Sequence, residues 1–269
     1  MLIQGLQKLT LLDYPGKVAC TVFTAGCNFR CPFCHNAPLV IDTHRNPEIS
    51  LKEIYQFLEK RKGILDGVCV SGGEPLIQHG IEIFLENLKR MGYAVKLDTN
   101  GSFPDKLKKI VEEGLVDYVA MDVKNSRENY GRTIGIEGYD TRNVEKSVGY
   151  LLSDAVDYEF RTTVVREFHQ RSDFEAIGRW IKGAKRYYLQ QFQDSGDLIR
   201  PGLHAYNDNI MRQALDVVKG ICPVSGAPGN LITDDQLNKS IKWQQYIVRM
   251  TKQTQYIVVF IDVYRDMVI

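Results

Sequence analysis

A chain of 269 residues with 44% hydrophobic and 25% charged residues is long enough for one large α/β domain with a substantial core. Its formal net charge of +1 provides no basic surface field, which disfavours nucleic acid as a partner held through its phosphates. No apolar run approaches the roughly 18 residues of a membrane-spanning helix. The start of the chain also lacks the pattern of a secretory signal. We therefore expect a cytoplasmic protein with no membrane partner.

Runs of β-branched and aromatic residues recur along the chain and predict six strands. These runs lie at residues 18–23, 67–70, 93–97, 116–121, 157–165 and 186–192. Segments with apolar residues at helical spacing separate them. Ser50 with Glu53 predicts a capping box for the helix that begins at Leu51, and Ser172 with Glu175 predicts another.

About six strand–helix units in alternation predict a parallel sheet with helices outside it. Periodicity alone leaves open whether this sheet is an open doubly wound sheet or a partial barrel. In both, ligands bind at the carboxyl ends of the strands.

The segment "GICPVSGAPGN", residues 220–230, is the best domain boundary. It divides the chain into a core domain, 1–220, and a C-terminal extension, 221–269. We expect a helix that begins near Thr233 and a strand at 256–264 in the extension, with a structural role.

The stretch "GCNFRCPFCHN", residues 26–36, places Cys27, Cys31 and Cys34 at spacings of four and three. In a reducing compartment, clustered thiols more often bind metal than form disulfides. A structural zinc site usually has four protein ligands in two separated pairs, and the fourth ligand is hard to find here. His35 directly follows Cys34, and the remaining cysteines lie in strand runs or alone: Cys20, Cys69 and Cys222.

A [4Fe–4S] cluster is the sharper interpretation of these cysteines. Such a cluster takes four thiolates when it only carries electrons. Three thiolates leave one iron with an open position, and an open position on a metal is where a substrate or cofactor binds. Residues 36–50 contain no further cysteine, so we expect a single cluster.

The C-x3-C-x2-C spacing, with Phe33 before the last cysteine, resembles the signature of the radical S-adenosylmethionine (SAM) superfamily. The resemblance covers about residues 10–220. It implies an α/β fold of the partial (β/α)6 barrel type, here with a C-terminal extension. It also implies that Cys27, Cys31 and Cys34 are the catalytic, metal-binding residues of a [4Fe–4S] cluster that binds SAM.

Polar residues follow several of the predicted strands, and the resemblance assigns them to the cofactor. "SGGEP", 71–75, would be a common turn by itself, but the resemblance implies that Gly73 and Glu74 bind the methionine amino group. "DTNG", 98–101, and "MDVK", 121–124, end neighbouring strands. We therefore expect their side chains to meet at the carboxyl ends of the parallel strands. The resemblance implies that they hold the methionine carboxylate and a monovalent cation, through Asp98, Thr99, Asn100, Asp122 and Lys124.

Three further residues complete the expected cofactor site. Arg161 could pair with a surface carboxylate, or, as the resemblance implies, lie near the cofactor carboxylate or ribose. Phe33 and His35 flank the last cysteine and are expected to contact the cofactor as well.

"Asp-x-Pro-Gly" before the first predicted strand and "Cys-His-Asn" after it resemble the activating enzymes of glycyl-radical enzymes. With "YGRTIG" at 130–135, the chain is similar to the branch of anaerobic ribonucleoside-triphosphate reductase activating proteins. The resemblance implies an oxidoreductase that cleaves SAM to a 5′-deoxyadenosyl radical, which takes hydrogen from a glycine of a glycyl-radical enzyme. It also implies a low-potential electron donor such as flavodoxin or ferredoxin.

Two alternatives are distinct from the activating enzyme. One is a radical SAM enzyme acting on a small molecule or modified nucleoside, with a barrel mouth closed by extra segments. The other is a zinc-binding adaptor without catalysis.

Overall fold

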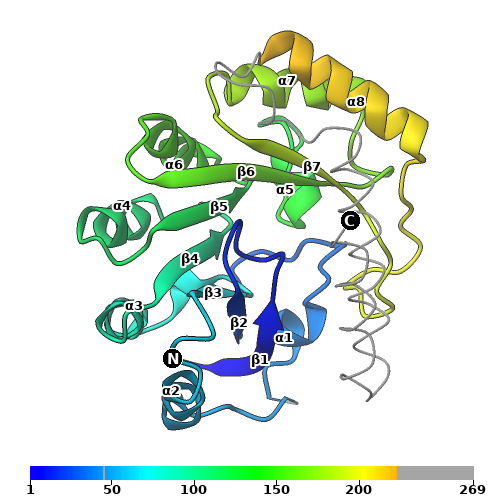
Figure 1. Cartoon of the computed structure of the whole chain (residues 1–269). Coiled ribbons are helices and arrows are strands. Elements are labelled where there is room, and N and C mark those ends of the chain that lie inside the picture. The colour runs from blue at the N-terminus through cyan, green and yellow to red at the C-terminus, as the bar shows by residue number, and fades with distance from the viewer. Residues whose placement is uncertain (45, 223–269) are drawn as a thin grey trace, which may run out of the picture. The chain divides into compact units, whose positions relative to one another are not determined.

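The computed structural model describes residues 1–44 and 46–222, and these form a seven-stranded sheet with helices along one face (Figure 1). The strands are adjacent in chain order. The first pair is antiparallel and all the others are parallel. The strands are β1 (Ile3–Thr10), β2 (Ala19–Thr24), β3 (Gly67–Gly72), β4 (Ala94–Thr99), β5 (Tyr118–Asp122), β6 (Asp157–Val164) and β7 (Tyr187–Gln191).

The strand order decides between the two folds that periodicity left open. A doubly wound sheet reverses direction at a switch point, whereas here every parallel crossover leads to the next strand on the same side. The predicted partial (β/α)6 barrel is confirmed, with β2–β7 as its strands. Its outer helices are α2 (Leu51–Glu59), α3 (Ile81–Arg90), α4 (Pro104–Glu112), α6 (Arg142–Leu152), α7 (Arg171–Trp180) and α8 (Asp208–Ile221). Right-handed crossovers in one direction place their long helices on one face, as Figure 1 shows for α2, α3, α4 and α6.

Short helices lie in the connections that follow three strands. They are α1 (Ala37–Ile41) after β2, the 3-10 helix η1 (Pro75–Ile77) after β3, and α5 (Tyr130–Ile134) after β5. None of the three was predicted, because each is shorter than two helical turns and shows no periodicity. All three belong to the carboxyl-end loops that surround the candidate site.

Two further elements, strand β1 and the start of α7, differ from the expected secondary structure. Strand β1 was not predicted, because "IQGLQKLT" is mostly polar and only its ends are buried. It is an antiparallel edge strand on β2. The cap of α7 was misplaced by two residues, since the Asp173 carboxylate accepts the N–H of Gln170 at 2.9 Å and Glu175 pairs instead with Arg171. The box of Ser50 and Glu53 on α2 is confirmed.

Side chains alternate between the two faces of a strand, and the two faces of this sheet differ in polarity. One face is buried and mostly apolar, and the register pairs Val22 with Val70, Val70 with Leu97 and Leu97 with Val119. This is the core beneath the helices. The opposite, inner face carries polar and charged side chains: Thr21, Cys69, Ser71, Lys96, Asp98, Asp122, Glu159 and Arg161.

The amino end of the barrel is closed by aromatic packing. Tyr14, from the "Asp-x-Pro-Gly" segment, packs against Tyr118 with ring centroids 6.1 Å apart, and Ala19 completes this small apolar cluster. This apolar cluster lies at the amino ends of β2 and β5, whereas Asp98 and Asp122 lie at the carboxyl ends of their strands.

The chain divides into the units Met1–Asn230 and Leu231–Ile269. The helix and strand predicted within the extension lie outside the described residues. Among the helices that the structure describes, none combines the length and the apolar character needed to cross a membrane.

Candidate active site

The cysteine loop joins β2 to α1 at the carboxyl edge of the sheet, and backbone hydrogen bonds fix its position. The Gly26 N–H donates to Leu39 O at 2.7 Å, and Gly26 O accepts the N–H of Glu74 at 2.9 Å. The Arg30 N–H donates to Ile134 O at 2.9 Å. The loop is thus attached to α1, to the segment after β3 and to α5.

Two glycines of "SGGEP" allow this attachment. A Cβ on Gly73 would lie 1.9 Å from Gly26 O, and one on Gly72 would lie 2.2 Å from Thr24 O. Both distances are far inside van der Waals contact. The glycines therefore let the backbone after β3 pass directly against the cysteine loop, and Asn36 adds a side-chain hydrogen bond to Gly72 O at 2.9 Å.

Aromatic residues pack around the cysteine loop. Phe33 lies against Phe168 with centroids 5.8 Å apart, and His35 stacks on Phe192 at 5.7 Å. Burial lowers the pKa of His35, which favours its neutral form. Phe33 and His35 therefore have protein partners in the structure, and their expected contact with the cofactor stays a prediction.

The "YGRTIG" segment forms α5 and supports the other side of the loop. Tyr130 is fully buried against Phe29, with ring centroids 6.4 Å apart. Gly135 has φ +72°, and a Cβ there would lie 2.4 Å from Arg30 O. A residue with a side chain is thus excluded at this position by both backbone conformation and space.

Cys27, Cys31 and Cys34 are free thiols that lie near one another and near Lys124. Burial raises the pKa of Cys27 to about 11 and of Cys31 to about 12, and it also raises the pKa of Cys34. The Lys124 ammonium opposes this shift at all three thiols. Thiolates in this position need further positive charge, which the irons of a cluster supply on binding.

The donor set fits a [4Fe–4S] cluster better than one zinc ion. Within residues 1–44 and 46–222, no three His, Cys, Asp or Glu side chains are grouped to hold a single metal ion. A cluster instead takes one thiolate at each of several irons. The other cysteines have different surroundings: Cys20 and Cys69 lie within strands, and Cys222 follows α8.

Glu74 lies at the first turn of η1 and is completely buried. Its carboxylate accepts from Leu76 N at 3.1 Å, from Thr99 Oγ1 at 2.8 Å and from Asn100 N at 2.7 Å. Burial raises its pKa to about 7, although these three hydrogen bonds act in the opposite direction. Thr99 thus contacts Glu74. Because neighbouring side chains of a strand point to opposite faces, Thr99 does not lie on the inner face with Asp98.

A row of alternating charges crosses the inner face from β4 to β6. Asp98 pairs with Lys96 and, at 3.4 Å, with Arg161. The Arg161 Nε donates to Asp122 at 3.1 Å, and Lys124 donates to the same carboxylate at 2.8 Å. The structure thus brings together Asp98, Asp122 and Lys124, as expected from the ends of their strands.

These ion pairs keep their members charged. Burial disfavours the charge on Asp122, but Lys124 and Arg161 outweigh it and lower the pKa of that carboxyl to about 2. Asp122 likewise raises the pKa of Lys124 against burial. Arg161 is only 16% exposed and faces Asp98, Asp122 and Glu159. The carboxylates that it pairs with thus belong to the inner face, and its expected place near the cofactor stays a prediction.

Sequence reasoning missed two members of this row. Lys96 is 1% exposed, and Glu159 accepts from the Tyr118 hydroxyl at 2.7 Å and lies 4.0 Å from Arg161. Their signal was present, because each stands two residues before a predicted site residue, Asp98 or Arg161, in the same strand. Residues two apart in a strand face the same side.

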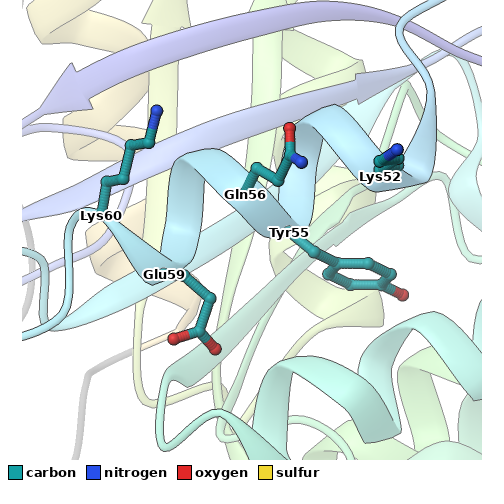
Figure 2. A pocket seen from close by; sticks show the side chains of 5 residues that line it. All are labelled: Lys52, Tyr55, Gln56, Glu59 and Lys60. Carbon is teal, nitrogen blue, oxygen red and sulfur yellow. The ribbon is translucent and has the colours of Figure 1, made fainter.

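The structure also has a groove elsewhere, on the outer side of α2, with a volume of about 660 Å³. Figure 2 shows its five lining side chains, four from this helix and one from the residue that caps its carboxyl end. They are Lys52, Tyr55, Gln56, Glu59 and Lys60. None of the expected site residues contributes to it.

Comparison with known proteins agrees with this fold and site. The model of the radical SAM superfamily matches residues 21–181. This span includes the three loop cysteines, the glycine turn and the row of charges. The chain therefore belongs to the radical SAM superfamily, and it is an enzyme that uses a [4Fe–4S] cluster and SAM.

Its similarities point to one branch, the glycyl-radical enzyme activating enzymes. A protein of Methanocaldococcus jannaschii with that provisional name is 32% identical over 196 residues, 71% of this chain and 80% of the relative. The pyruvate formate-lyase-activating enzyme of Clostridium pasteurianum is 30% identical over 146 residues, 51% of this chain and 60% of the relative. With the family established, the zinc-binding adaptor is excluded.

Two further similarities define the limits of this assignment. The 7-carboxy-7-deazaguanine synthase of Koribacter versatilis is 29% identical over 166 residues, 61% of this chain and 67% of the relative. Among solved structures, Streptococcus suis SuiB bound to its precursor peptide SuiA superposes with a TM-score of 0.62 at 13% identity. That match covers 82% of this chain and 49% of SuiB, and at this identity it shows the fold alone.

Proposed function

We propose that this enzyme installs a glycyl radical on a partner protein, with an anaerobic ribonucleotide reductase as the partner. The observation that carries the proposal is the loop of three free thiols beside a row of buried charges, in a chain whose relatives carry activating-enzyme names. When bound, the cluster and SAM supply one-electron cleavage of a carbon–sulfur bond, giving methionine and a 5′-deoxyadenosyl radical that takes a hydrogen atom from a glycine.

The proposed role of the loop is to hold the cluster through Cys27, Cys31 and Cys34. Phe33 and His35 stabilise the loop by their aromatic contacts and lie next to its last cysteine. Because Gly73 holds the turn before Glu74 against Gly26, that turn lies next to Cys27, the first of the proposed cluster ligands. This proximity supports binding of the methionine amino group by Gly73 and Glu74.

The row of charges is the proposed binding surface for the carboxylate of the methionine group and for a monovalent cation. Lys124 and Arg161 are cations that could receive a carboxylate, and Asp98 and Asp122 are anions that could hold a monovalent cation. Thr99 and Asn100 connect this row to Glu74. The chain binds and aims the cofactor, and its own side chains need not transfer a proton.

The proposed domain division places all of this chemistry in residues 1–220, with 221–269 as a C-terminal extension. All six cysteines are free thiols, which supports the proposed cytoplasmic location. The proposed electron donor is a flavodoxin or a ferredoxin.

The test is anaerobic activation of a purified ribonucleotide reductase of the glycyl-radical type. Reconstituted enzyme, SAM and reduced flavodoxin are mixed with the reductase, and electron paramagnetic resonance (EPR) measures the glycyl radical. We expect the radical, together with 5′-deoxyadenosine and methionine, from wild type but not from Cys31→Ser. SAM cleavage without a glycyl radical on the reductase would contradict the proposal.

A second candidate function is radical chemistry on a small molecule or nucleoside precursor. The similarity to 7-carboxy-7-deazaguanine synthase favours it. Incubation of the reconstituted enzyme and SAM with a small-molecule extract, followed by a chromatographic assay for 7-carboxy-7-deazaguanine, separates the two functions. Formation of that compound, with no glycyl radical on the reductase, would support this second function.

A further inference from the structure

Cys27 differs from the other two loop cysteines in the donors that reach its sulfur. The backbone N–H of Phe29 donates to Cys27 Sγ at 3.3 Å, and the side-chain amide of Asn100 donates at 3.8 Å. In the part of the chain that the structure describes, Asn100 provides the only side-chain donor to any of the three thiols. This contact crosses from the end of β4 to the loop after β2.

The hydrogen bonds of Asn100 determine which end of its amide faces the sulfur. The backbone N–H of Ser102 can only donate, and it lies 2.9 Å from Asn100 Oδ1. The Ser102 hydroxyl donates to the same oxygen at 2.6 Å. The oxygen is therefore held toward Ser102, which leaves Nδ2 facing Cys27.

Asn28 completes a closed ring of side chains around this amide. Its Oδ1 accepts the other N–H of Asn100 at 2.9 Å, and its Nδ2 donates to the Ser102 hydroxyl at 2.9 Å. Asn100 and Ser102 are 6% and 5% exposed. The donor to Cys27 is therefore buried and oriented before any cofactor binds.

We propose that Asn100 tunes the reduction potential of the cluster through its hydrogen bond to Cys27, and that Asn28 and Ser102 are its positioning residues. The inference rests on the proposed role of Cys27 as a cluster ligand. Hydrogen bonds to the sulfurs are among the factors that set iron–sulfur potentials. Reduction adds one negative charge, and a donor stabilises the more negative state more strongly. Asn100 therefore raises the potential.

The test is a potentiometric titration of the anaerobically reconstituted full-length chain without SAM, followed by EPR of the reduced cluster. Asn100→Leu is close in size and removes the donor. We expect about four irons per chain and a potential shifted to more negative values. A tenfold change in the equilibrium between the oxidised and reduced states, which is the order we expect, corresponds to about 59 mV for one electron.

Asn125→Leu is the matched control. Asn125 is also a buried amide, but its side chain donates to Thr133 and to Phe168 O, with no contact to a sulfur. We expect its potential to equal that of the wild type. Ser102→Ala should shift the potential in the same direction as Asn100→Leu, and Ser102→Thr, which keeps the hydroxyl, should restore it. Equal potentials for the two Ser102 variants would overturn the positioning role.

A measurement on the wild type covers the case in which Asn100→Leu takes up no cluster. Protein labelled with ¹⁵N at the side-chain amide of asparagine should show a ¹⁵N coupling in pulsed EPR of the reduced cluster. An Asn100→Leu cluster at the wild-type potential, or no coupling in the wild type, would overturn the inference. Neither result would contradict the proposed activating function, because that function is tested separately by the glycyl radical formed on the partner protein.

Discussion

Asp122 is the residue on which two largely buried cations of the inner face depend. Its carboxylate accepts from Lys124 at 2.8 Å and from Arg161 at 3.1 Å. Removing one partner of a buried ion pair leaves uncompensated charge, which costs more than the pair itself contributes.

We expect Asp122→Asn to lower the free energy of unfolding by about 1 to 3 kcal/mol at pH 7, the usual effect of losing hydrogen bonds to charged groups. Denaturant unfolding followed by circular dichroism measures it. Asp140→Asn is the control, because Asp140 pairs with Arg142 on the exposed surface, where the change should stay within about 0.5 kcal/mol. Equal losses for the two variants would refute the expectation.

The same residue gives a pH dependence with a defined sign. The cations lower the pKa of Asp122 from its ordinary 3.8 to about 2. Its stabilisation is therefore fully present above 3.8 and is lost as the pH falls through about 2. Because asparagine does not titrate, the stability gap between wild type and Asp122→Asn should narrow between pH 4 and pH 2. A gap that stays constant over this range would show that Asp122 does not act as an anion.

At the residue scale, the sequence grouped the candidate residues better than it predicted their contacts. Spacing grouped the three cysteines, and strand ends grouped Asp98, Asp122 and Lys124, while the roles assigned to them stay predictions. Lys96 was missed because a lysine within an apolar run is read as exposed, while its Asp98 partner lies two residues away. The hydrogen bond between Glu74 and Thr99 depends on how the turn after β3 meets the end of β4, which no local pattern records.

At the scale of elements, the turn after β3 is held to the cysteine loop by the absence of a side chain at Gly73. We expect Gly73→Ala to separate the two segments, because its Cβ would lie 1.9 Å from Gly26 O. Iron bound after anaerobic reconstitution measures the effect, and we expect most of the iron to be lost.

Gly149→Ala is the control for this substitution. A Cβ at Gly149, within α6, meets nothing within 4 Å, and alanine is favoured over glycine in a helix by about 1 kcal/mol. We expect this variant to bind iron like the wild type. A Gly73→Ala protein with full iron content would show that the two segments can move apart at no cost to the cluster.

Helices and strands were predictable where apolar residues recur at a regular spacing because one face of the element is buried. The six parallel strands are buried on at least one face and were found within about two residues. Strand β1 lies at the edge and is mostly half-buried or exposed, so alternation was absent. The start of α7 was misplaced because Ser172 and Glu175 fit a capping pattern at a position where the chain had already become helical.

At the scale of the whole molecule, every candidate site residue lies in the unit Met1–Asn230. We therefore expect a chain that ends at residue 230 to take up about four irons and to cleave SAM under reduction at a rate within about threefold of the full chain. Chromatographic detection of 5′-deoxyadenosine measures this rate. Loss of iron binding on truncation would show that residues 231–269 belong to the cofactor-binding unit.

The arrangement of the whole sheet was the part that the sequence could not decide. Strand and helix periodicities are equal in doubly wound and barrel folds, because both bury one face of each helix. Only the order of neighbours separates them, and this order is set by contacts between distant segments. The resemblance to a known family, not the pattern, favoured the barrel beforehand.

The row of charges on the inner face has a consequence for how solutes reach it. It contains three cations, Lys96, Lys124 and Arg161, and three anions, Asp98, Asp122 and Glu159. The row has equal numbers of positive and negative groups, so it adds no net charge to the inner face, and its pull on a charged solute is screened beyond about one Debye length, roughly 8 Å at physiological ionic strength. A solute that reaches the row meets a fixed order of positive and negative groups, and it is selected by whether its own charges match that order.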